Sequence, residues 1–137
     1  MAKILLAGAQ QENESLKLFK TCAEYTRKYA KTVTVPTTSA YLSFKLGMMT
    51  LYLSGYGDAK PFFEEAIQIW EENDYRMKDD CGLAYNFIGM YYYVIERDYA
   101  KAKHYFSESY SILSAVSSDQ AGIASYNLRL AEDALNA

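Results

Sequence analysis

Proline, cysteine and histidine are scarce in this sequence, which has two prolines, two cysteines and one histidine among 137 residues. Because so little proline interrupts regular structure and half of the residues are hydrophobic, the composition favours packed helices over disorder. Cys22 and Cys81 lie far apart without a CxxC motif, and His104 does not complete a zinc site with them at any usual spacing. We therefore expect no metal and no cofactor, and interpret both cysteines as small buried thiols in a reducing compartment.

A basic excess and a long apolar run are also missing. The formal net charge is −3 at pH 7, and Lys and Arg alternate with Asp and Glu, whereas nucleic-acid binding needs a clustered basic patch. No run approaches the ~20 apolar residues of a membrane span, and the apolar run at 4–9 is shorter than the ~7–15 residues of a signal peptide. We therefore expect a soluble, cytoplasmic protein with neither nucleic-acid nor membrane partners.

The most informative stretch is the amphipathic segment Tyr56–Trp70, whose pattern returns 43 residues later as Tyr99–Leu113. The two copies share residues of the same type at helical spacing, namely Tyr56/Tyr99, Ala59/Ala102, Lys60/Lys103, Phe63/Phe106, Glu65/Glu108 and Ile69/Ile112. Self-similarity at this period predicts a solenoid of helix pairs, a fold that usually presents a binding surface.

Hydrophobic periodicity predicts an all-α chain of about seven helices in one domain. We expect them at about 2–10, 12–32, 39–54, 56–73, 80–96, 99–115 and from the turn at 117–119 to 135. The segment 32–38, which contains Pro36, is interpreted as a linker, with a short strand as the alternative. Asp58 is expected to cap the fourth helix with Pro61 in its first turn, and Asp79 or Asp80 to cap the fifth.

Gly47 and Gly89 recur 42 residues apart, each inside the first helix of a pair. A glycine inside a helix costs roughly 1 kcal/mol relative to alanine. Its repetition at matched positions therefore predicts a close approach between helices at both places.

At these residues the chain resembles the tetratricopeptide repeat (TPR) family. The first unit carries Leu46-Gly47, Tyr56, Ala59, Phe63 and Ala66. The second carries Ile88-Gly89, Tyr92, Tyr99, Ala102 and Phe106, with Ser109 in place of the last alanine and about one extra residue between its helices. The resemblance implies a right-handed superhelix of antiparallel helix pairs. Its units are a degenerate N-terminal unit (1–38), repeat 1 (39–78), repeat 2 (79–118) and a capping helix (119–137).

The resemblance also implies that the first helices of the pairs line a concave groove that binds a protein partner. The residues expected to face this groove are Tyr41, Phe44, Met48, Leu51, Tyr52, Asn86, Met90, Tyr93, Ile123, Tyr126 and Asn127. Methionine and tyrosine together make an adaptable contact surface, so we expect an apolar peptide or helix as the partner. The alternative for each residue is packing against a neighbouring helix. A clamp for a terminal carboxylate is disfavoured, because the positions that would supply its cations are occupied by Phe44, Met48 and Ile123.

Enzyme activity is not expected. The acidic pairs at 64–65, 71–72 and 79–80 are interpreted as a solvated face or helix caps, and His104 as an exposed partner of Glu108. No glycine-rich phosphate loop or nucleophile elbow occurs. The alternatives to an adaptor are a self-assembling homo-oligomeric scaffold and a peptide-signal sensor module of a regulatory protein.

Overall fold

The computed structural model describes residues 14, 17–18, 21–22, 24–25, 28–29 and 35–137. The part of the chain it describes is all-α and contains no strand. Its elements are α2 (Pro36–Ser54), α3 (Tyr56–Glu72), α4 (Asp79–Tyr91), the π-helix η1 (Tyr92–Glu96), α5 (Tyr99–Ala115) and α6 (Ala121–Asn136). The helix expected at 2–10, and most of the one at 12–32, lie outside the described residues.

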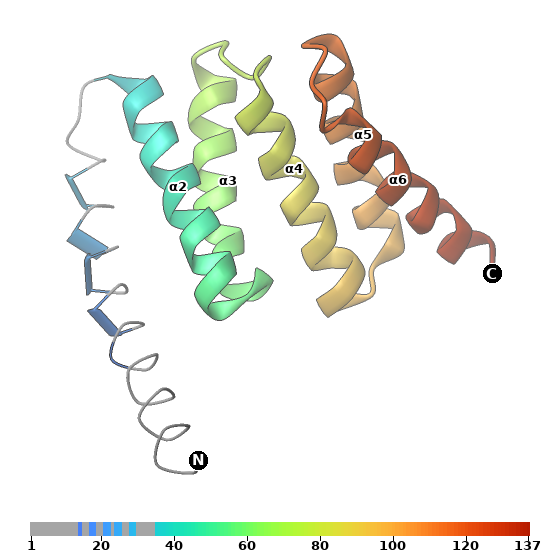
Figure 1. Cartoon of the computed structure of the whole chain (residues 1–137), viewed down its shortest axis with the longest axis horizontal. Coiled ribbons are helices and arrows are strands. Elements are labelled where there is room, and N and C mark those ends of the chain that lie inside the picture. Colours follow the sequence, from blue (N-terminus) through green and yellow to red (C-terminus); the bar gives the residue numbers. More distant parts are fainter. Residues whose placement is uncertain (1–13, 15–16, 19–20, 23, 26–27, 30–34) are drawn as a thin grey trace.

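The five helices from α2 to α6 stand in a row, with each one packed against the next along the chain (Figure 1). Helices α2, α4 and α6 form one layer, and α3 and α5 form a second layer behind it (Figure 1). We call the outer side of the first layer the front face and the outer side of the second layer the rear face. Alternate helices therefore present their exposed residues on opposite sides of the molecule.

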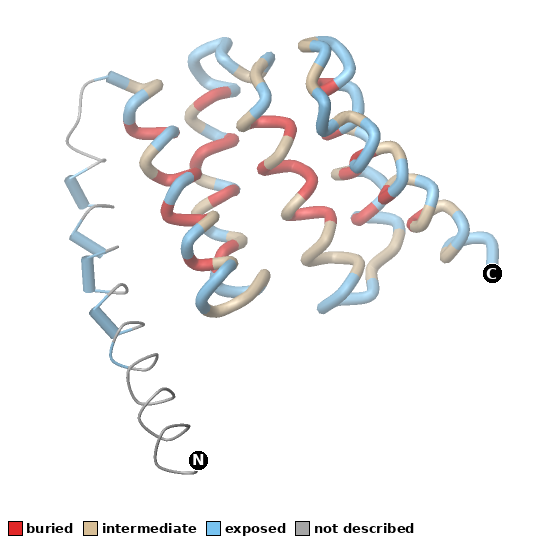
Figure 2. Tube along the Cα trace, viewed as in Figure 1, coloured by how far each residue is buried: buried red, intermediate tan, exposed pale blue. Residues whose placement is uncertain are grey.

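The core lies between the two layers, where the buried positions of successive helices face each other (Figure 2). Phe44 of α2 is in contact with two aromatic residues of α3, with ring centroids 5.8 Å from Phe63 and 5.9 Å from Trp70. The adjoining positions are filled by Cys81, Tyr85 and other buried residues of α4. A smaller cluster of Ala102, Phe106 and Ala131 joins α5 to α6. Burial of these side chains is the main source of the fold's stability.

The close approach predicted at the two helical glycines is confirmed. A β-carbon on Gly47 would stand 2.7 Å from the ring of Phe63, and one on Gly89 would stand 2.6 Å from the ring of Phe106. Each glycine thus admits an aromatic ring from the next helix, in α2/α3 and again in α4/α5. The same contact is built twice from residues at matched positions of the sequence.

The extra residue of the second unit coincides with the π-helix η1. A π-turn holds more residues than an α-turn, so it accommodates one inserted residue without breaking the helix. At its end, Arg97 adopts a left-handed conformation with φ 53°, and the Asp98 N–H donates to the Tyr92 carbonyl over 2.9 Å. Asp98 then caps α5 by accepting a 3.1 Å hydrogen bond from the Lys101 N–H. The turn predicted at this point is confirmed.

The predictions for the starts of α2, α3 and α4 are each wrong in one respect. Helix α2 begins at Pro36 rather than near residue 39, because proline suits the first turn, where no intrahelical N–H is needed. Helix α3 begins at Tyr56, so Pro61 lies inside it, and Asp58 accepts a hydrogen bond from the Ser54 hydroxyl instead of capping.

Helix α4 also begins without the expected side-chain cap. Lys78 occupies the cap position, and Asp79 and Asp80 lie in the first turn. In the first turn, their negative carboxylates interact favourably with the positive end of the helix dipole.

Candidate functional site

Helix α2 has an unusual composition for a helix with an exposed side. Lys45 is the only charged residue in its 19 positions. A surface helix normally carries charged and polar residues on its exposed side. One side of α2 is buried against α3 and the core, but on the other side Tyr41, Met49 and Tyr52 are 49%, 52% and 90% exposed.

Together with half-buried Met48, the exposed residues on this side form the α2 surface, which we define as Tyr41, Lys45, Met48, Met49, Tyr52 and Leu53. Four of them, from Met48 to Leu53, line an apolar hollow of about 380 Å³ near the end of the helix. Methionine side chains adapt to different shapes, and tyrosine joins an apolar ring to a polar tip. The hollow is therefore suited to apolar side chains from another chain.

Lys45 lies at the centre of the α2 surface. Its ammonium nitrogen is 5.3 Å from the centroid of the Tyr41 ring and 6.0 Å from that of Phe44. Among the described residues, the ion pairs involve other side chains, and no carboxylate pairs with Lys45. The surface thus offers one positive charge in an otherwise uncharged setting.

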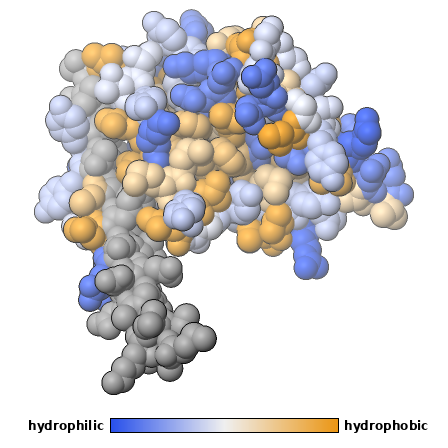
Figure 3. All heavy atoms as spheres, viewed as in Figure 1, coloured by the Kyte–Doolittle hydropathy of each residue, from blue (hydrophilic) through white to orange (hydrophobic). Residues whose placement is uncertain are grey.

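The middle of the front face continues this apolar character. Leu83, Phe87 and Met90 of α4 are half-buried, and hydrophobic side chains gather over the central part of the face (Figure 3). Phe87 stacks on Phe63 with ring centroids 5.0 Å apart, which fixes α4 against α3. Tyr93 of η1 lies with its ring centroid 5.2 Å from that of Tyr99. These residues combine a packing role with a partly exposed surface.

The structure divides the predicted groove residues into three groups. Four are exposed, namely Tyr41, Tyr52, Ile123 and Tyr126. Four more are half-buried, namely Met48, Leu51, Met90 and Tyr93. The remaining three are buried, namely Phe44, Asn86 and Asn127.

For the three buried residues the predicted groove position is wrong. Phe44 is 2% exposed and fills the core between α2 and α3. Asn86 and Asn127 hydrogen-bond to each other, with the Asn127 Nδ2 donating to the Asn86 Oδ1 over 3.0 Å. Because each amide satisfies part of the other's hydrogen-bonding capacity, the pair joins α4 to α6 inside the protein and does not face a partner.

Met49 and Leu53 were missed among the candidate residues. A signal was present in the sequence, because Met49 lies four residues from Lys45 and three from Tyr52, on the same side of the helix. The register of the resembled family assigns neither residue to the groove.

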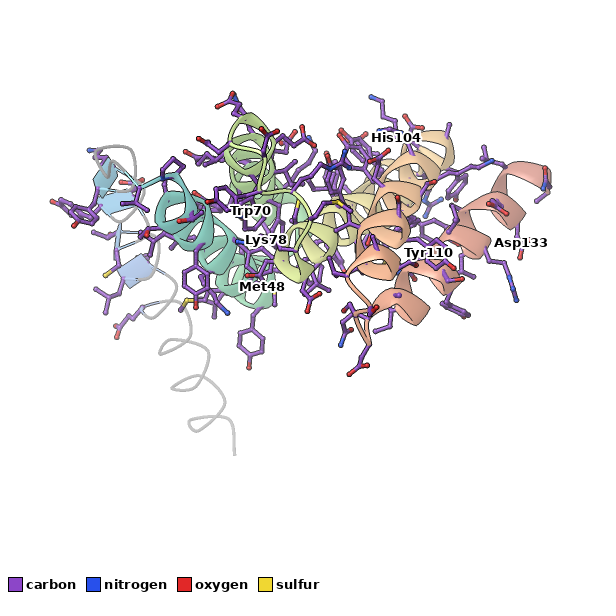
Figure 4. All side chains as sticks on the ribbon, turned by 90° about the horizontal axis from the view of Figure 1, so that it is seen from above. Met48, Trp70, Lys78, His104, Tyr110 and Asp133 are labelled. Atoms are coloured by element: carbon purple, nitrogen blue, oxygen red, sulfur yellow. The ribbon has the colours of Figure 1, made fainter. Side chains whose placement is uncertain are left out.

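The rear face has a second hollow, of about 460 Å³, whose polar lining comes mainly from α3 and α5. Glu71 accepts a hydrogen bond from the Tyr85 hydroxyl, and Glu64 pairs with Lys60 over 3.4 Å. His104 lies at this side of the molecule, away from Met48 (Figure 4). These pairings partly neutralise the acidic wall of the hollow.

The expected contact between His104 and Glu108 is replaced by a longer-range one. Glu108 accepts from the Arg76 guanidinium over 2.5 Å, which ties α5 to the segment before α4. This contact raises the pKa of Arg76, with the hydrogen bond that Arg76 donates to Glu108 as the largest cause. Within the described residues, no group of three His, Cys, Asp or Glu side chains is arranged to hold a metal ion.

The buried groups near the rear hollow stay uncharged. Burial raises the pKa of the Cys81 thiol to about 12. Burial also raises the pKa of Tyr85, and its hydrogen bond to Glu71 adds to the effect. Neither group is poised to act as a nucleophile or base near neutral pH.

None of the described helices combines the length and the apolar character needed to cross a membrane. Comparisons with known proteins give no match: no family model, curated protein or solved structure matches the chain.

Proposed function

We propose that this chain is a protein-interaction module of the TPR-like type, which binds an apolar peptide or helix of a partner on the α2 surface. The single observation that carries the proposal is the exposure of Tyr41, Met49 and Tyr52 on a helix with only one charged residue. Exposed apolar patches of this kind mark interaction sites on soluble proteins, because covering them removes apolar area from water.

The repeated glycine–phenylalanine contact supports the assignment to helical-repeat proteins. Gly47 with Phe63 and Gly89 with Phe106 occupy the positions at which the resembled family places its glycine and aromatic residue. The exposed side of α6 carries Arg129 and Asp133 beside Ile123 and Tyr126, whereas Lys45 is the only charged residue of α2. This difference in charge favours α2 as the side that receives a partner.

A self-assembled scaffold remains the second candidate, since the exposed side of α2 also suits another copy of the chain. Light scattering on the purified full chain separates the two. An adaptor is monomeric without its partner, while a scaffold forms a defined oligomer whose mass falls when Tyr52 is changed to alanine.

The binding role itself is tested with Tyr52→Ala and the matched variant Tyr110→Ala. Tyr110 is also an exposed tyrosine but lies on α5, away from the α2 surface. We expect Tyr52→Ala to weaken partner binding by about 2 kcal/mol, a typical loss for an aromatic hot spot, with little change in melting temperature. Tyr110→Ala should leave binding intact. Equal effects of the two variants would remove the α2 surface from the proposal.

A further inference from the structure

The exposed side of α2 has a simple pattern along its length. Thr38, Tyr41, Lys45, Met49 and Tyr52 follow one another at spacings of three or four residues, so they form one stripe along the helix. Lys45 stands midway between Pro36 and Ser54. The stripe is therefore apolar or uncharged on both sides of one central cation.

We propose that the occupant of the α2 surface is an α-helix of a different protein, with an apolar stripe and one carboxylate near its middle that pairs with Lys45. The inference rests on the proposed binding function and adds the chemistry of the partner. A helix presents side chains at the same spacings of three and four residues as this stripe, so it can match the stripe along its length. Apolar residues on either side of its carboxylate would meet Tyr41 and the hollow at Met48–Leu53.

The charge at the centre argues for a carboxylate. Lys45 lies over the Tyr41 ring, and no carboxylate of the described residues pairs with it. Covering the α2 surface with a wholly apolar helix would remove the ammonium group from water without a partner, which is costly. A carboxylate on the incoming helix removes this cost and fixes the register of the two helices.

The same charge argues against a second copy of this chain. In a two-fold dimer each residue at the axis faces its own mate, and an antiparallel pair of α2 helices would have its axis near the helix midpoint. Lys45 would then face Lys45 of the other copy, and like charges repel. A head-to-tail contact would instead place the outer side of α6, with exposed Ile123, Tyr126, Arg129 and Asp133, against α2, and Arg129 would add a second positive charge to a surface whose one charge is already positive.

The test uses the full chain and two synthetic helical peptides that differ at one position. Both carry the same stripe of leucine and phenylalanine, with glutamate at the centre of one and lysine at the centre of the other. Fluorescence anisotropy of labelled peptide gives the dissociation constants. We expect the glutamate peptide to bind about tenfold more tightly, and the preference to fall as salt is added.

Two variants make the test specific. Lys45→Glu should reverse the preference in favour of the lysine peptide, while Tyr52→Ala should weaken both peptides. Both residues are exposed, so circular dichroism should show that each variant keeps the native helix content.

The outcomes separate the inference from the function on which it rests. Equal binding of the two peptides, weakened by Tyr52→Ala, overturns the central carboxylate and leaves the proposed function standing. Binding of neither peptide overturns both. A dimer that Tyr52→Ala dissociates identifies the occupant as a second copy and overturns the inference.

Discussion

Gly89 lies so close to Phe106 that a β-carbon on the glycine would stand 2.6 Å from the Cδ1 atom of the ring. Gly47 has the same relationship with Phe63, at 2.7 Å. Both rings are about 1% exposed, so neither has room to move away. The cost of a helical glycine is therefore offset by an aromatic ring that packs against the bare backbone of its neighbour.

Replacement of Gly89 by alanine should lower the free energy of unfolding by about 1–3 kcal/mol, because the added methyl group overpacks the contact with Phe106. Urea unfolding followed by circular dichroism measures the change. Gly122→Ala is the control, since a β-carbon there would meet no atom within 4 Å and the helix propensity of alanine favours it. A loss of equal size in both variants would show that the ring contact does not require glycine.

Truncation of the Asn86–Asn127 pair should reveal coupling between α4 and α6. Asn127→Ala leaves the Asn86 amide buried without this partner, so we expect a loss of about 1–3 kcal/mol in unfolding free energy. The double variant with Asn86→Ala should lose less than the sum of the two single variants. Strict additivity in urea unfolding would mean that the hydrogen bond contributes nothing to stability.

The features that could be predicted from the sequence are those that depend on spacing. The copies that begin at Tyr56 and Tyr99 gave the start of two helices, and the helix at 99–115 has the predicted bounds. The glycine contacts could be predicted because a destabilising residue recurred at matched positions. Spacing does not predict whether a residue is buried when its type is common both in exposed and in buried positions. Asn86 is as compatible with a wet groove as with a buried amide pair, and only the position of α6 decides between them.

The exposed residues of the surface proposed for binding could be predicted only in part, for a related reason. A register borrowed from a family assigns each position one side of the helix, and so it placed Phe44 in the groove and omitted Met49. The composition of α2 is a better guide, because an exposed side with a single charge is unusual for a surface helix. That argument locates the surface without assuming a family.

Cys81 should resist alkylation in the native protein. Its pKa is raised to about 12 by burial, against 9.0 for a free thiol, so its reactive thiolate is depleted about a thousandfold at pH 8. The expectation that both thiols are buried is wrong for Cys22, which is exposed and should react first. Mass spectrometry after iodoacetamide treatment should show one modified cysteine in the native chain and two in urea. Rapid native modification of Cys81 would contradict its burial.

Deletion of Ile95 tests the origin of the π-helix. The residue is 55% exposed in η1, and its removal gives Gly89 and Tyr99 the same separation as Gly47 and Tyr56. We expect η1 to become an ordinary α-helical turn, with the helix content kept and the melting temperature unchanged or raised, as circular dichroism would show.

The matched control is deletion of Ser107, which is also exposed but lies within α5. This deletion rotates the rest of the helix by about 100°, so that Ser109 and Ile112 leave their buried positions. We expect a loss of about 3 kcal/mol or more, because core side chains would then face water. Equal destabilisation by the two deletions would show that the fold needs the wide turn itself. Tolerance of the Ile95 deletion alone identifies η1 as the place where the second helix pair absorbs its additional residue.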